Sequence, residues 1–81
     1  MTLRHAAHGW AAQPTCELWN WLAVYQGEID WRRRFIAIGN SPPSEIDGLA
    51  REIQSRVVAC MEIVGELKRR GIHSDQLPDF N

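Results

Sequence analysis

Hydrophobic residues recur along this chain in two long runs that have the spacing of amphipathic helices. In the first run, positions on one face advance in alternating steps of four and three residues: Leu18, Leu22, Tyr25, Ile29, Arg32, Ile36 and Gly39. The second run repeats the pattern at Ile46, Ala50, Ile53, Val57, Cys60, Val64, Leu67 and Gly71. Residues three and four apart share one side of an α-helix, so each run predicts a helix with one seam for a neighbour.

Proline and glycine mark the boundaries of these runs. Pro14 precedes the first, the segment GNSPPS at 39–44 separates the two, and Gly71 ends the second. We therefore predict one all-α domain over residues 1–81. It comprises an N-terminal tail or short helix at 1–14, helices at 15–39 and 44–71, a loop at 40–43 and a C-terminal tail at 72–81. Because the loop is short, the helices should form an antiparallel hairpin.

The predicted helix ends carry capping signals. Thr15 can cap the first helix, and Ser44 with Asp47 approximates a capping box for the second. Gly71 suits the left-handed position after a helix, from which Ile72 can fold back toward Leu67. Three pairs spaced four residues apart should support the second helix, namely Asp47–Arg51, Glu52–Arg56 and Glu66–Arg70.

The first helix has a weak point near its middle. Gly27 costs about 1 kcal/mol relative to alanine inside a helix, and Asp30 could cap a fresh start. The sequence leaves open whether this helix is continuous, kinked or split there.

A second apolar stripe on the first helix exceeds what a hairpin can bury. Val24, Trp31 and Ile38 lie nearly opposite the seam, with Phe35 beside them. An apolar stripe left in water is rare in a stable monomer, so something should cover it. The candidates are the N-terminal segment with Leu3 and Trp10, the C-terminal tail with Leu77 and Phe80, a second copy of the chain in a helical bundle, or another protein. The predicted interface residues are Val24, Trp31, Arg34, Phe35, Ile38, Val58 and Met61.

The segment WRRRF at 31–35 has three arginines between two aromatics. Successive helical residues point about 100° apart, so these arginines fan out and form no compact phosphate clamp. Arg32 falls on the hairpin seam, where its guanidinium must reach a carboxylate such as Glu28 or Glu52, and Arg34 should point outward. The alternative is a nucleic-acid contact surface made by Arg32, Arg33, Arg34, Lys68, Arg69 and Arg70.

Charge argues against long-range attraction to nucleic acid or anionic membrane. Nine Lys and Arg against ten Asp and Glu give a formal net charge of −1, which leaves only local basic patches. The N-terminal residues lack a continuous apolar run like that of a signal peptide, and 18 consecutive apolar residues occur nowhere. We expect a soluble, cytoplasmic protein with reduced cysteines.

Candidate chemistry is sparse. His5, His8, Cys16, Cys60 and His73 could be imagined as a metal site, but no Cys-x-x-Cys pair occurs and we predict no metal. Cys16 in a first helical turn is the one candidate nucleophile, whereas Cys60 occupies a seam position. Four further carboxylates, Asp30, Glu45, Glu62 and Glu66, have the pattern of solvated helix charges. We therefore predict no cofactor and no enzymatic activity, and a small module that binds another protein, as an adaptor, inhibitor or accessory subunit.

Overall fold

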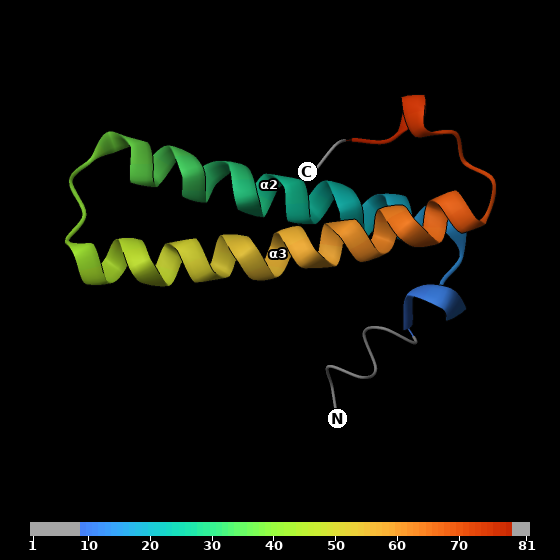
Figure 1. The fold of residues 1–81 in the computed structure, drawn as a ribbon, viewed down its shortest axis with the longest axis horizontal. Helices are drawn as coiled ribbons and strands as arrows, with labels where there is room; N and C mark the ends of the chain where they lie inside the picture. The colour runs from blue at the N-terminus through green and yellow to red at the C-terminus, as the bar shows by residue number, and fades with distance from the viewer. Residues whose placement is uncertain (1–8, 79–81) are drawn as a thin grey trace.

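The computed structural model describes residues 9–78, and these form the predicted antiparallel helical hairpin (Figure 1). Helix α2 spans Thr15–Ile38 and helix α3 spans Pro43–Arg69, followed by the short 3-10 helix η1 at Ser74–Gln76. Residues 9–12 make one further helical turn before α2. In Figure 1 residues 9–14 and 70–78 lie at the same end of the hairpin, on opposite sides of it.

Prolines, rather than the predicted side-chain caps, mark the start of both helices: Pro14 directly precedes α2, and Pro43 is the first residue of α3. The residues preceding them, Pro14 and Pro42, adopt extended backbone, and no side chain caps either helix. The carbonyl of Pro14 instead accepts the N–H of Glu17 at 3.0 Å. The predictions of a Thr15 cap and of a Ser44 capping box are therefore wrong. Pro43 has no N–H that would need a partner in the first turn of α3, and the Thr15 hydroxyl accepts a hydrogen bond from Arg70.

Glycines end the helices as expected. Gly39 has a φ of 82° and its N–H donates to the carbonyl of Ile36. Gly71 has a φ of 91°, and the N–H of Ile72 donates to the carbonyl of Leu67 at 3.1 Å. These left-handed positions favour glycine, and the second arrangement is a Schellman motif. The predicted return of Ile72 toward Leu67 is confirmed.

Helix α2 is continuous through Gly27, so the chain neither splits nor restarts at Asp30. The predicted seam positions are buried or half-buried except Gly39, Ala50 and Gly71, and the core is densest at the end away from the loop. It consists of Leu18, Leu22, Ile29, Cys60, Ile63, Val64 and Leu67. Ile63, which lies off the predicted seam, is fully buried, whereas the seam residue Ala50 is exposed.

The terminal segments cover only the end of the hairpin that carries this core. Trp10 and Leu77 are half-buried against it. Trp10 lies edge-on to Tyr25, with ring centroids 6.5 Å apart, and its indole N–H donates to Glu62 at 3.1 Å. Of the proposed covers for Trp31, these two therefore pack elsewhere, and Leu3 and Phe80 lie outside the described residues.

Candidate functional site

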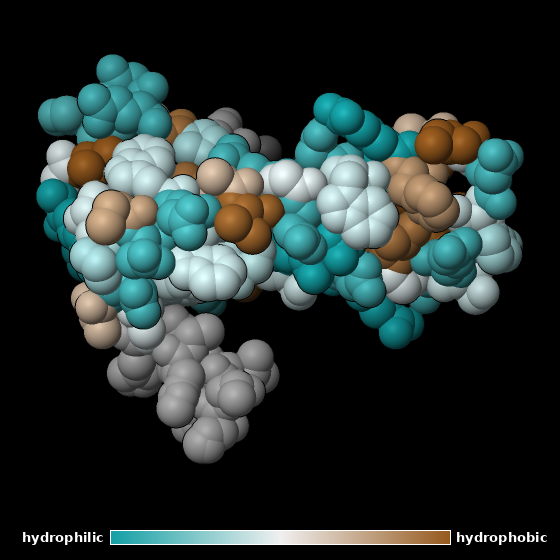
Figure 2. All heavy atoms as spheres, turned by 180° about the vertical axis from the view of Figure 1, so that it is seen from behind, coloured by the Kyte–Doolittle hydropathy of each residue, from teal (hydrophilic) through white to brown (hydrophobic). Residues whose placement is uncertain are grey.

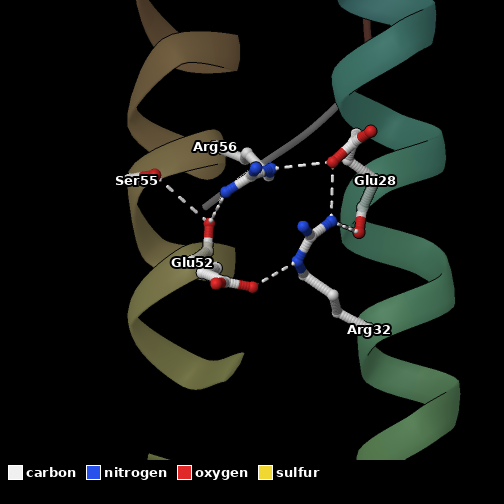
Figure 3. A network of polar contacts seen from close by, with 5 residues as sticks. All are labelled: Glu28, Arg32, Glu52, Ser55 and Arg56. Atoms are coloured by element: carbon white, nitrogen blue, oxygen red, sulfur yellow. Dashed lines mark hydrogen bonds and ion pairs between the residues drawn. The ribbon is translucent and has the colours of Figure 1, made fainter. Parts of the chain in front are cut away.

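A charged network joins the two helices near the middle of the hairpin (Figure 3). Arg32 is only 8% exposed; its Nε donates to Glu52 of α3 at 2.8 Å and its Nη1 to Glu28 at 2.7 Å. Arg56 of α3 also reaches Glu28, at 3.1 Å. The predicted partners of Arg32 are confirmed. Glu52 and Arg56, expected to pair through their side chains within α3, instead bind across to α2. Within α3, the Arg56 guanidinium donates to the backbone carbonyl of Glu52 and not to its carboxylate.

The network shifts the titration of its members. Hydrogen bonds from Arg32 and then Arg56 stabilise the carboxylate and lower the pKa of Glu28 from its ordinary 4.5. The hydrogen bond to Glu52 is the largest cause that raises the pKa of Arg32. Both groups therefore remain charged at neutral pH, and the pattern is that of a structural ion network rather than a general acid or base.

Five large apolar side chains of α2 lie outside the core, with exposed fractions between 38% and 65%. They are Trp21, Val24, Trp31, Phe35 and Ile38, here named the α2 stripe. Four were predicted from the sequence. Trp21 was missed, although it lies three residues before Val24 and extends the same helical spacing. Figure 2 shows hydrophobic surface at the loop end of the molecule and further hydrophobic groups toward the opposite end, with hydrophilic surface between them.

Contacts within the hairpin hold part of the α2 stripe in place. The guanidinium carbon of Arg32 lies 4.4 Å from the ring centroid of Trp31, and Phe35 meets Trp31 edge-on at 6.5 Å. Because Arg32 is itself fixed by Glu28 and Glu52, the Trp31 ring rests on an immobilised cation. Trp31 nevertheless remains 48% exposed.

The predicted interface residues do not share one face. Glu28 and Arg32 lie on the flank of α2 that leads to Trp31, and they meet Glu52 and Arg56 on the facing flank of α3. Val58 follows Arg56 by two residues, about 200° around the helix, and thus lies on the other flank of α3. Val58 and its neighbour Met61 are exposed there, away from the α2 stripe. Arg34 points outward at the edge of the stripe and pairs with Asp30 at 2.8 Å.

The basic residues considered for nucleic acid are mostly engaged within the hairpin. Arg32 is buried in the network, Arg34 pairs with Asp30, and Arg69 and Arg70 both pair with Glu66. Glu66 is 8% exposed, so the prediction that it is a solvated charge is wrong. Among residues 9–78, Arg33 and Lys68 are the two members of the set without an ion pair.

Arg70 has a role that the sequence did not indicate beyond its pairing with Glu66. Its guanidinium donates to the carbonyls of Trp10, Ala11 and Gln13, the last at 2.6 Å, and to the Thr15 hydroxyl at 3.0 Å. These carbonyls belong to the segment before α2, and the Trp10 carbonyl also accepts the Gln13 N–H at 3.3 Å. Arg70 therefore fastens that segment to the end of α3.

The described residues offer little catalytic or metal-binding geometry. Cys16 is exposed, and burial raises the pKa of the Cys60 thiol to about 11. No group of three or more potential metal ligands occurs between residues 9 and 78, where His73 lies exposed; His5 and His8 fall outside this range. An open depression of about 450 Å³ beside Gly27 is lined by Gln26, Ile29, Asp30 and Arg33. Its carboxylate, Asp30, is already paired with Arg34.

No protein-family model, curated protein or solved structure matches this chain. Neither α2 nor α3 has an apolar stretch sufficient to span a bilayer.

Proposed function

We propose that this protein is a protein-protein interaction module that binds its partner through the α2 stripe. The observation that carries the proposal is the exposure of Trp21, Val24, Trp31, Phe35 and Ile38 along one side of a helix whose other side is buried. Aromatic residues with a neighbouring arginine are the typical anchors of binding hot spots.

The exposed apolar area is large for a chain of 81 residues. With full side chains of roughly 150–250 Å², the exposed fractions of the α2 stripe amount to about 500 Å². That is near the largest apolar patch of a typical monomer, and such patches are often binding sites.

The polar surroundings of the stripe support specific binding. Arg34 lies at the edge of the stripe in an exposed ion pair with Asp30, and Glu28 lies on the flank between the stripe and α3. An apolar centre with charged groups at its border is the usual layout of a protein interface. Because Trp31 rests on the fixed Arg32 side chain, little rotamer freedom is left for it to lose on binding.

Site-specific photo-crosslinking can test this proposal. A benzophenone amino acid is placed at Phe35 in the stripe or, as a control, at Met61, which is similarly exposed on the other flank of α3. In cells that naturally produce the protein, irradiation should give discrete protein adducts from position 35 and few from position 61. Equal labelling at the two positions, or none at 35, would contradict the proposal.

A salt series separates this function from nucleic-acid binding. Association through the α2 stripe should change little between about 50 and 500 mM salt, because apolar burial does not depend on screened charges. Binding through phosphate contacts would weaken steeply over the same range.

A further inference from the structure

We infer that the partner of the α2 stripe is the α2 stripe of a second copy of this chain, with the two α2 helices antiparallel. This inference rests on the proposed function and specifies its partner. It is carried by the spacing of the exposed residues, the sizes of the side chains that would meet, and the area that would be buried.

Helix α2 has a second seam with heptad spacing. Trp21, Val24, Glu28, Trp31, Phe35 and Ile38 advance in steps of three and four, as the buried seam from Leu18 to Ile36 does. Side chains spaced in this way interlock with a straight helix whose side chains have the same period. A second α2 provides such a helix.

The sizes of these side chains favour antiparallel pairing. When the helices run in opposite directions, Trp21 lies level with Ile38 of the second copy, and Val24 with Phe35, so that each layer combines a larger and a smaller side chain. In a parallel pair, Trp31 would face Trp31 and Phe35 would face Phe35, which overfills these layers. A parallel pair would also place Glu28 opposite Glu28, and like charges in register repel.

Glu28 is compatible with the antiparallel seam. Its Oε1 already accepts from Arg32 at 2.7 Å and from Arg56 at 3.1 Å, so its charge is compensated within its own hairpin. In the antiparallel pair it lies level with Trp31 of the second copy, whose indole N–H is a hydrogen-bond donor. Glu28 would thus meet a residue able to donate a hydrogen bond to it.

The area suits a reversible dimer. About 500 Å² of apolar surface from each chain gives about 1,000 Å² in total, near the lower limit of specific interfaces. A two-fold axis makes the contact closed, so that dimers form and not filaments. The dimer should therefore dissociate on dilution.

Sedimentation of the full chain at several concentrations provides the first test. The average mass should rise from 9.3 kDa toward twice that value as concentration increases. Phe35→Ser should raise the dissociation constant by about 30-fold or more, since the substitution acts on both sides of the dyad. Met61→Ser, on the other flank of α3, should leave it unchanged. An equal loss of dimer affinity in Phe35→Ser and Met61→Ser would overturn the inference.

Disulfide trapping tests the orientation. In a Cys16→Ser background, Val24→Cys and Phe35→Cys chains are mixed and mildly oxidised. Disulfides between the two variants should predominate. A predominance of Val24→Cys joined to itself would show a parallel pair and overturn the inference.

A chain that stays at 9.3 kDa at all concentrations would also overturn it. Adducts of a different protein at position 35 would then leave the proposed function standing, whereas the absence of any adduct would end both.

Discussion

Arg32 and Glu52, twenty residues apart in the sequence, meet across the two helices with Nε and Oε1 at 2.8 Å. This contact places a charged residue in the seam between α2 and α3, where Arg32 is 8% exposed. The same guanidinium supports the Trp31 ring and binds Glu28, so one buried cation connects the interior of the hairpin to its exposed apolar surface. The structure thereby links folding of the hairpin to the shape of the proposed interface.

Replacement of Glu28 by glutamine should make the stability of the fold depend less on pH under acidic conditions. The pKa of Glu28 is lowered by folding, so its stabilisation is complete above its ordinary value of 4.5 and is lost as pH falls through the lowered folded value. Between about pH 7 and pH 3, the melting temperature should decrease less in Glu28→Gln than in the wild type.

Asp30→Asn provides the matched control. Asp30 forms an equally spaced pair with Arg34, but both side chains are more than half exposed. This substitution should leave the profile nearly unchanged, because exposed pairs contribute little. A profile for Glu28→Gln that parallels the wild type would contradict the role assigned to the network.

Ile63→Ala should destabilise the hairpin strongly. Ile63 is fully buried between the helices, and removal of such a side chain leaves a cavity that costs about 2–5 kcal/mol. Urea unfolding at low protein concentration measures the difference. Val58→Ala on the exposed flank should change stability by less than about 0.5 kcal/mol, and a comparable loss there would mean that the flank is covered.

Arg70→Ala should release the turn at residues 9–12 from α3. The substitution removes donors to three backbone carbonyls and to Thr15, at an expected cost of about 2 kcal/mol. Hydrogen exchange should become faster at the Gln13 amide, which donates to the Gly9 carbonyl. Arg69→Ala is the control, because Arg69 also pairs with Glu66. Its side chain is exposed, so the substitution should have little effect. Equal acceleration in both variants would count against this role for Arg70.

The two cysteines should differ in reactivity. Burial raises the pKa of the Cys60 thiol to about 11, so it lacks both access and thiolate character, whereas Cys16 is exposed. Alkylation of the folded protein near pH 8 should modify one thiol quickly and the second only after unfolding. Mass spectrometry of tryptic peptides identifies the site, and rapid labelling of Cys60 in the folded protein would refute its burial.

Most of the fold could be predicted because its determinants are local. The alternating spacing of apolar residues specifies two helices, and Gly39 and Gly71 end them because glycine readily adopts left-handed backbone. The exposed stripe on α2 also follows from spacing alone, since a single neighbouring helix covers one side. The functional role of that stripe stays a prediction, and so does the cytoplasmic location.

The remaining details depended on which side chains the tertiary structure brings together. Threonine is a residue type that often caps helices, yet the Thr15 hydroxyl accepts a hydrogen bond from Arg70, fifty-five residues away. Glu52 and Arg56 have the spacing of a local pair, but α2 offers each a partner across the interface. Spacing alone also missed the burial of Ile63 and Glu66, which depends on the helix rotation and on the packing around the end of α3.

The sequence by itself thus determined two helices, their approximate limits and the presence of surplus apolar surface, because each depends on residues a few positions apart. Only the tertiary structure decided that Val58 and Met61 lie away from Trp31, and that buried Arg32 and half-buried Arg70 hold distant segments together. These outcomes depend on how far each helix is rotated toward its neighbour, and that rotation is fixed by packing between residues remote in the sequence.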